Sequence, residues 1–244
     1  MDTRKRRRKS SNVRFALVWT AVLVTSLIGI GIAHFSSVPA WAKGVRRYFL
    51  KGPAICIDAG HGGEDAGASS GGQIEKEQTL RIAQLVEDDL ESDGIRVIMT
   101  RDDDSTTSLE SRVQTANDAG ALGFVSIHRN MYNGTKTDVK GVEIWTSHDA
   151  GEAETDLARL VLEHLTETGY ITSRGIKGGS MDDPETDYYV IRNTQMPSIL
   201  IELGFLSSED DRAMVEEYAD VTARAIADGI EDWMNEQTET ESSR

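Results

Sequence analysis

The sequence predicts a single α/β domain in which a largely parallel central β-sheet is flanked by helices. Apolar runs of strand length alternate with longer stretches whose apolar residues recur at helical spacing, which is typical of a parallel sheet covered by helices. With 244 residues and 39% hydrophobic content, the chain can bury one sizeable core. The single cysteine, Cys56, excludes an intramolecular disulfide, and its apolar neighbours indicate a buried thiol.

The first 42 residues differ from the rest of the chain. Residues 1–14 carry seven Lys/Arg and one Asp, and residues 15–33 follow without a charge. A basic segment before an apolar span that can cross a bilayer is typical of an export signal. Because Ala40, Trp41 and Ala42 offer a small-x-small cleavage site, two alternatives stay open. The leader is either a retained signal anchor or a cleaved signal peptide, and both predict an extracytoplasmic protein.

The remainder of the chain is strongly acidic. The whole chain has a formal net charge of −15, and the first fourteen residues contribute +6, so the remainder carries −21. Because phosphate backbones are bound by Lys and Arg, this charge argues against nucleic acid as a partner. The acidic surface suits ordinary solubility or a high-salt environment.

The elements of the domain are expected between residues 54 and 235, after a linker at residues 43–53 and before a polar tail at residues 236–244. In the helix after the first strand, Leu80, Ala83, Val86 and Leu90 recur near helical spacing. The expected strands are residues 54–58, 95–100, 122–127, 141–147, 188–192 and 197–205, and the expected helices are residues 74–90, 109–119, 153–168 and 209–233.

Three polar residues follow or end predicted strands. His61 comes shortly after the first strand, His128 directly after the third, and Glu202 near the end of the last, while Glu75 begins the first helix. Ligand sites of such folds gather at the carboxyl ends of the strands. Two imidazoles and a carboxylate at one edge would suit a catalytic zinc, which takes three protein ligands.

From the residues alone, two interpretations of His61, Glu75 and His128 stay open: a zinc site, or separate structural roles for each residue. The spacing is not a compact motif such as HExxH, a histidine after a strand is often structural, and a glutamate at a helix start is favourable with the helix dipole. The remaining histidines, His34, His148 and His164, are interpreted as structural or surface residues. Gly60, Gly62 and Gly63 around His61 indicate an irregular turn in which the backbone passes close to a ligand.

A set of ordered motifs resembles a known family. DAGHGGEDAGA, GGQIEKEQTL, VIMTR, LESRVQTAN, FVSIHRN, GVEIW, RGI and PSILIELGFLSS are similar to the motifs of the zinc-dependent N-acetylmuramoyl-L-alanine amidases of the type-3 family. The resemblance covers roughly residues 54–233. The compact build with an N-terminal leader is similar to that of the short germination-type members that act on spore cortex.

The resemblance implies roles for individual residues. His61, Glu75 and His128 would be the three zinc ligands, and Glu202 would be the catalytic carboxylate. The segment IEKEQ also offers Glu77, two residues beyond Glu75. Because a helix turns about 100° per residue, only one of the two can be a ligand, and Glu75 is preferred.

Three further positions can be compared with the family. Arg174 matches an arginine near the family's site and would either form a structural salt bridge or bind a substrate carboxylate. Asn130 is expected to support the loop or a ligand rather than to catalyse. Ser208 stands where the family usually has asparagine.

The function implied by the resemblance is zinc-dependent hydrolysis of the amide bond between N-acetylmuramic acid and L-alanine in peptidoglycan. A water activated by Zn²⁺ would attack, with Glu202 as general acid/base. The protein would act on the cell wall, either secreted to it or anchored to the cytoplasmic membrane by the N-terminal helix. An activator protein is kept as a further candidate partner.

Two alternatives come from other functional classes. The chain could be a catalytically inactive wall-binding or regulatory protein on the same fold, or a zinc exopeptidase that acts on stem peptides. The 73 residues between His128 and Glu202 leave little space for a helix that blocks the site, so an open site is predicted.

Overall fold

The computed structural model describes residues 52–134 and 138–242, and the described residues belong to one compact unit, Phe49–Arg244. The predicted leader at residues 1–42 lies outside the described residues. The elements follow in this order: β1 (Ala54–Ala59), β2 (Ser69–Ser70), β3 (Gln73–Ile74), α3 (Glu75–Ser92), β4 (Arg96–Met99), α4 (Leu109–Ala119), β5 (Gly123–Asn130), β6 (Val142–Thr146), α5 (Glu152–Glu167), β7 (Ser173–Gly178), α6 (Tyr189–Asn193), β8 (Ser198–Phe205), α7 (Glu209–Glu217) and α8 (Ala219–Ser242).

The central sheet has six strands in the order β4-β1-β5-β8-β6-β7. Every neighbouring pair is parallel except β6 and β8, which run antiparallel. The fold class predicted from the sequence is therefore confirmed. The reversal at β6 brings the beginning of β6 to the edge of the sheet where β5 and β8 end.

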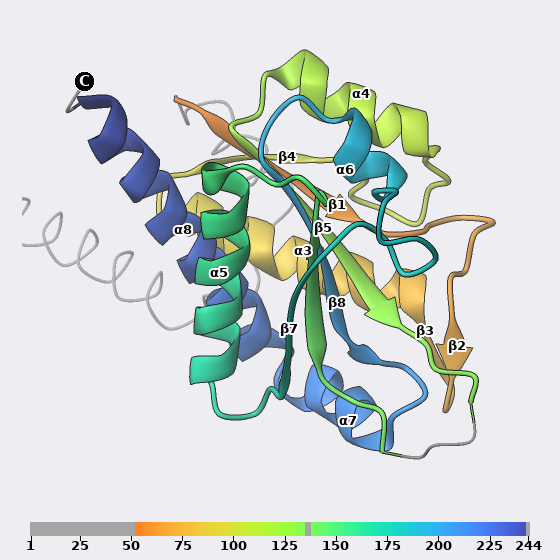
Figure 1. Cartoon of the computed structure of the whole chain (residues 1–244). Helices are drawn as coiled ribbons and strands as arrows, with labels where there is room; N and C mark the ends of the chain where they lie inside the picture. Colours follow the sequence, from red (N-terminus) through yellow and green to blue (C-terminus); the bar gives the residue numbers. More distant parts are fainter. Residues whose placement is uncertain (1–51, 135–137, 243–244) are drawn as a thin grey trace, which may run out of the picture. The chain divides into compact units, whose positions relative to one another are not determined.

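Helices cover both faces of the sheet (Figure 1). Apolar residues of α3, α5 and α8 form one core cluster with Ile55 and Ile57 of β1, and those of α4 and α6 form another with Cys56. This division follows from the strand itself, since successive side chains point to opposite faces. Cys56 is fully buried, as predicted.

Local sequence explains where helices begin and end. The side chain of Ser108 accepts a hydrogen bond from the backbone N–H of Ser111 at the start of α4, and Gly120 adopts the left-handed conformation at its end. Ser208 caps α7 in the same way by accepting from the N–H of Asp211. Serine and asparagine are both good helix caps, so serine at position 208 preserves this feature.

Several elements differ from the prediction. Residues 188–192 were expected to form a strand, but α6 begins at Tyr189. Val190 and Ile191 are consecutive and both lie in one core cluster, which a strand would prevent because it points neighbours to opposite faces. The strand β7 was not predicted, because an edge strand with mostly exposed and half-buried residues lacks an apolar pattern.

The predicted helix at residues 209–233 is two helices. Tyr218 separates α7 from α8 with non-helical dihedral angles (φ −115°, ψ 28°). Its ring stacks on that of Tyr170 with 4.0 Å between centroids. The second helix, α8, then continues to Ser242, through most of the segment predicted as a polar tail. Within residues 52–134 and 138–242, no helix combines the length and the apolar character needed to span a membrane.

Candidate metal centre and active site

The fold brings together the two histidines and the glutamate that the sequence singled out. His61 lies in the loop after β1, Glu75 is the first residue of α3, and His128 lies near the end of β5. Their ligand atoms all lie within 4.8 Å of one another. Three residues separated by up to 67 positions in the chain thus form one compact cluster, which we call the metal cluster.

One carboxylate oxygen stands at the centre of the metal cluster. Glu75 Oε1 lies 3.1 Å from His61 Nε2 and 3.1 Å from His128 Nδ1. It also accepts a hydrogen bond from the backbone N–H of Arg129 at 2.9 Å, and Glu75 Oε2 accepts one from the N–H of Ala68 at 2.8 Å. Both carboxylate oxygens are therefore held in place by backbone groups.

Two glycines make this close approach possible. A Cβ at Gly60 would collide with the imidazole ring of His128, and a Cβ at Gly67 would lie 2.6 Å from Glu75 Oε2 and 2.7 Å from His61 Cδ2. Gly60 was expected from the sequence to allow a close approach. Gly67 was not singled out, although it stands in the same glycine-rich motif.

His61 has a backbone conformation that is rare for a residue with a side chain. Its φ is 61°, in the left-handed region. Two buried arginines hold the loop: Arg112 Nη2 donates to the carbonyl of His61 at 2.5 Å, and Arg101 Nη2 donates to that of Gly60 at 2.9 Å. Asp65 Oδ2 lies 2.8 Å from His61 Nδ1. Because Asp65 accepts from Nδ1, Nε2 is left to face the metal cluster.

The charges of the metal cluster reinforce one another. Burial opposes the charged form of His61. The hydrogen bond from His61 to Glu75 and the negative charge of Glu75 outweigh this effect and raise the pKa of His61 to about 8. Burial likewise opposes the charged form of Glu75, but the hydrogen bonds to His128 and His61 hold the pKa of this carboxyl well below its usual range. Glu75 is therefore an ionised carboxylate, the form that binds metal.

The donor set of the metal cluster fits a zinc ion. Two imidazole nitrogens and one carboxylate oxygen are the kind of ligand set that catalytic zinc sites use, with a further position left for water. The carboxylate of Asp65 behind His61 is the usual arrangement for fixing a metal-binding imidazole. The alternative ligand Glu77 is exposed and lines a different pocket, together with Arg81 and Glu216.

Glu202 lies next to the metal cluster, in β8. Its Cα pairs with that of His128 across the parallel strands β5 and β8. The side chain is buried, and its Oε2 has no hydrogen-bond partner within the described residues. Burial raises the pKa of Glu202 to about 7; nearby His128 opposes this increase, whereas Glu75 and Glu143 add to it. A carboxyl group with this pKa can both take up and release a proton near neutral pH.

Asn130 and Arg174 do not join the metal cluster. Both contact Glu143, a residue of β6 that the sequence interpretation did not single out: Asn130 Nδ2 donates to its Oε2 at 3.3 Å and Arg174 Nε to its Oε1 at 2.5 Å. Lys177 Nζ lies 2.7 Å from the same Oε1. A salt bridge, one of the two roles considered for Arg174, is present in the structure.

Glu143 was missed because the sequence could not show the direction of β6. Its Cα pairs with that of Glu202 across antiparallel strands, and Glu202 in turn pairs with His128. In an all-parallel sheet, the beginning of this strand would lie at the far edge. The available signal was the motif GVEIW, and the motifs VIMTR and LESRVQTAN likewise contained Arg101 and Arg112.

The described site is accessible to solvent. The side chains of His61 and His128 keep 23% and 20% of their surface exposed. The described helices between β5 and β8 are α5 and α6, which pack in the two core clusters rather than over the histidines. This geometry supports the predicted open site.

Comparisons with known proteins agree with this geometry. The family described as N-acetylmuramoyl-L-alanine amidase matches residues 55–232. The uncharacterized protein YqiI of Bacillus subtilis is 37% identical over 190 residues, which cover 77% of this chain and 87% of YqiI. The probable cell wall amidase LytH of Staphylococcus aureus is 32% identical over 186 residues, covering 74% of this chain and 58% of LytH.

Solved structures show the same fold. The N-acetylmuramoyl-L-alanine amidase AmiC2 of Nostoc punctiforme matches with a TM-score of 0.68 and 34% identity over 75% of this chain and 97% of AmiC2. The CwlD amidase of Clostridioides difficile, solved in complex with the GerS lipoprotein, matches with a TM-score of 0.67 and 28% identity over 75% of this chain and 99% of CwlD. Since the family match spans most of the chain, the protein belongs to the N-acetylmuramoyl-L-alanine amidase family of cell wall hydrolases.

Proposed function

We propose that this protein is a zinc-dependent amidase that hydrolyses the bond between N-acetylmuramic acid and L-alanine in peptidoglycan. The observation that carries the proposal is the metal cluster of His61, Glu75 and His128 beside Glu202, a buried carboxyl group with an unpartnered oxygen. Family membership supplies the substrate class, and the site contains the groups that amide hydrolysis needs.

His61, Glu75 and His128 would hold the zinc ion. When bound, zinc supplies a Lewis acid that polarises the amide carbonyl and makes water a better nucleophile at neutral pH. Arg101, Arg112 and Asp65 contribute by holding the His61 loop, so the ligands are arranged before substrate arrives.

Glu202 would move the proton. Its free Oε2 can accept a proton from the attacking water and then donate that proton to the departing nitrogen of L-alanine, and its burial favours the protonated form that this donation needs. The amine leaves in its neutral form, and the carboxylate is regenerated for the next turnover.

The position of the enzyme in the cell is part of the proposal. Residues 1–42 would direct export, as a retained anchor in the cytoplasmic membrane or as a cleaved signal, and residues 54–235 would form the catalytic domain on the outer side. The expectation of a role in sporulation or germination comes from the resemblance to the short germination-type members. The CwlD relative was solved in complex with a lipoprotein, which supports the expectation of a protein partner.

Zinc dependence provides the test of this function. The purified full-length protein is incubated with peptidoglycan, and newly formed amino groups are quantified before chelation, after chelation and after zinc is restored. We expect the formation of new amino groups to stop on chelation and to resume when zinc is restored. Release that persists in a metal-free sample would overturn the proposal, and release of C-terminal amino acids alone would instead support a zinc exopeptidase.

A further inference from the structure

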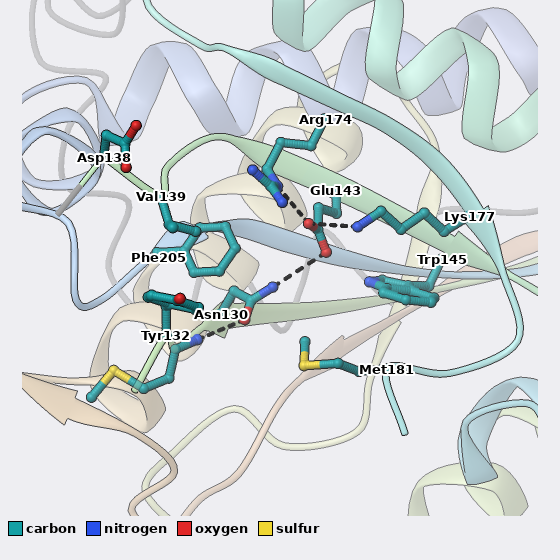
Figure 2. A pocket seen from close by; sticks show the side chains of 11 residues that line it. Asn130, Tyr132, Asp138, Val139, Glu143, Trp145, Arg174, Lys177, Met181 and Phe205 are labelled. Carbon is teal, nitrogen blue, oxygen red and sulfur yellow. Dashed lines mark hydrogen bonds and ion pairs between the residues drawn. The ribbon is translucent and has the colours of Figure 1, made fainter. Parts of the chain in front are cut away.

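A pocket of about 570 Å³ opens beside Glu143, on the side of the active site away from His61. Figure 2 shows Arg174, Lys177 and Asn130 converging on the Glu143 carboxylate in this pocket. The metal cluster and Glu202 do not line it. The pocket is therefore a separate feature next to the proposed catalytic groups.

The pocket contains more positive charge than its buried carboxylate requires. The Glu143 side chain is only 3% exposed, and it receives both Arg174 at 2.5 Å and Lys177 at 2.7 Å on one oxygen. Around Glu143 itself, two cations therefore face one carboxylate. Asp138 also lines the pocket, but Figure 2 shows it apart from the ion pairs, beyond Val139.

The two cations keep donors free for a ligand. The Nε of Arg174 donates to Glu143, and its Nη1 lies 3.5 Å from the carbonyl of Lys140. Its Nη2 has no hydrogen bond among the residues that the structure describes. Lys177 Nζ has no other acceptor in that part of the chain. The side chains of Arg174 and Lys177 are 36% and 34% exposed, so these donors can be reached from solvent.

Aromatic rings fix both cations in position. The Arg174 guanidinium lies 5.1 Å from the centroid of Phe205, and Lys177 Nζ lies 5.1 Å from that of Trp145. Such contacts orient a cation and leave its N–H groups available for an anion. Arginine and lysine held in this way are suited to a carboxylate.

Sheet geometry places Glu143 at a defined distance from the proposed catalytic groups. His128, Glu202 and Glu143 are successive partners across β5, β8 and β6. At about 4.8 Å per strand, Glu143 lies about 5 Å from Glu202 and about 10 Å from His128 along the sheet. Since an extended residue spans about 3.5 Å, about 5 to 10 Å corresponds to roughly one and a half to three residues of a peptide that leads away from the metal cluster and Glu202.

We propose that Arg174 and Lys177 form a subsite for the stem peptide that binds the free carboxylate of its second residue, with Glu143 positioning both cations. The inference rests on the proposed function, since it assumes that the amide of L-alanine lies between the metal cluster and Glu202. In peptidoglycan, the second residue is a glutamate linked through its side chain, so its α-carboxyl group is either free or amidated. The subsite would therefore distinguish these two chemistries.

The test compares two synthetic muramoyl tripeptides that differ only at this group, one with the carboxylate and one with the carboxamide. Zinc-loaded full-length protein and its Lys177→Met variant are assayed on both. We expect the variant to lose about 10–100-fold in kcat/KM on the carboxylate substrate and less than about threefold on the carboxamide, because one charge-assisted hydrogen bond is removed. Lys177→Arg should restore most of the loss.

Lys140→Met serves as the control, because Lys140 is a nearby cation whose amine pairs with Asp210 outside the pocket. It should leave the ratio of the two substrates unchanged. Equal losses on both substrates for Lys177→Met, or no loss on either, would overturn the subsite while the amidase function stands. If the wild-type protein hydrolyses neither substrate, the proposed function itself fails.

Discussion

Glu202 differs from the other buried carboxylates of the described chain in its hydrogen bonding. Asp58 and Glu75 have partners on both oxygens, whereas Glu202 Oε2 has none. Leaving a buried oxygen without a partner is costly, so such groups in native proteins usually serve a function. Glu202 itself pairs with His128 of the metal cluster, where the proposed reaction would take place.

Replacing Glu202 with glutamine should therefore separate catalysis from metal binding. Glu202→Gln keeps the shape of the side chain but cannot take a proton, so we expect kcat to fall by about 10²–10⁴-fold. Zinc content should stay at the wild-type level, as measured by elemental analysis on the same preparation. Turnover close to wild type would contradict a role in proton transfer.

The two neighbouring glutamates at the start of α3 provide a matched comparison. Glu75 points into the metal cluster and Glu77 is exposed. Losing a group that supports a metal ligand typically lowers metal affinity by about 10–100-fold. Glu75→Gln removes a proposed ligand itself, so it should weaken zinc binding by more than this. Glu77→Gln should leave it unchanged. The measurement is the zinc Kd by competition with a chromogenic chelator, and equal effects of the two substitutions would show that the choice of Glu75 is wrong.

At the scale of elements, β1 carries the loop of His61 and is anchored by one buried ion pair. Asp58 Oδ1 lies 2.6 Å from Arg112 Nη1, and the same arginine donates to the carbonyls of Ala59 and His61. Burial alone would raise the pKa of Asp58, but Arg112, together with Ser126 and Thr100, outweighs it and holds the pKa below its usual value. Asp58 therefore stabilises the fold in its ionised form.

The lowered pKa of Asp58 predicts that the stability it contributes depends on pH. Because the folded-state pKa lies below the unfolded value of about 3.9, the stabilisation is present above that pH and is lost as pH falls through the folded pKa. Asp58→Asn should lower the free energy of unfolding at pH 7 by about 3–5 kcal/mol, since Arg112 is left buried without its counter-charge. Urea unfolding at pH 7 and in acid should show the difference shrinking in acid. A constant difference would contradict the account.

In the loop that follows β1, the backbone of Gly60 lies close to the side chain of His128. Gly60 contacts the ring of His128 and does not adopt positive φ, so Gly60→Ala tests crowding without backbone strain. We expect a displaced His128 and a zinc affinity lowered by about tenfold or more. Gly151→Ala is the control, because a Cβ there meets no atom within 4 Å. Unchanged zinc affinity in Gly60→Ala would show that the close approach is not needed.

At the scale of the whole molecule, the alternation of apolar patterns predicted most of the architecture. Strand and helix patterns located β1, β4, β5, β6 and β8 and the helices α3, α4 and α5. Because carboxyl ends of parallel strands share an edge, the sequence also predicted that His61, His128 and Glu202 would meet. That convergence followed from topology, and the assignment of ligand roles followed from the family resemblance.

What the sequence could not supply were features set by tertiary contacts. The direction of β6 depends on its pairing with β8, and it decides that Glu143 lies beside Glu202. The edge strand β7, which carries Arg174 and Lys177, has no apolar periodicity to reveal it. The short helix α6 is set by packing of two consecutive apolar residues on one face. The pocket beside Glu143 therefore became visible only in the folded chain.

The most direct test of the central claim is mass spectrometry of the fragments that the zinc-loaded protein releases from purified peptidoglycan. The account predicts stem peptides that begin at L-alanine, together with glycan strands that lack peptide, and neither product in a chelator-treated sample. Intact muropeptides, or peptides shortened at the other end while the bond from N-acetylmuramic acid to L-alanine stays intact, would contradict it.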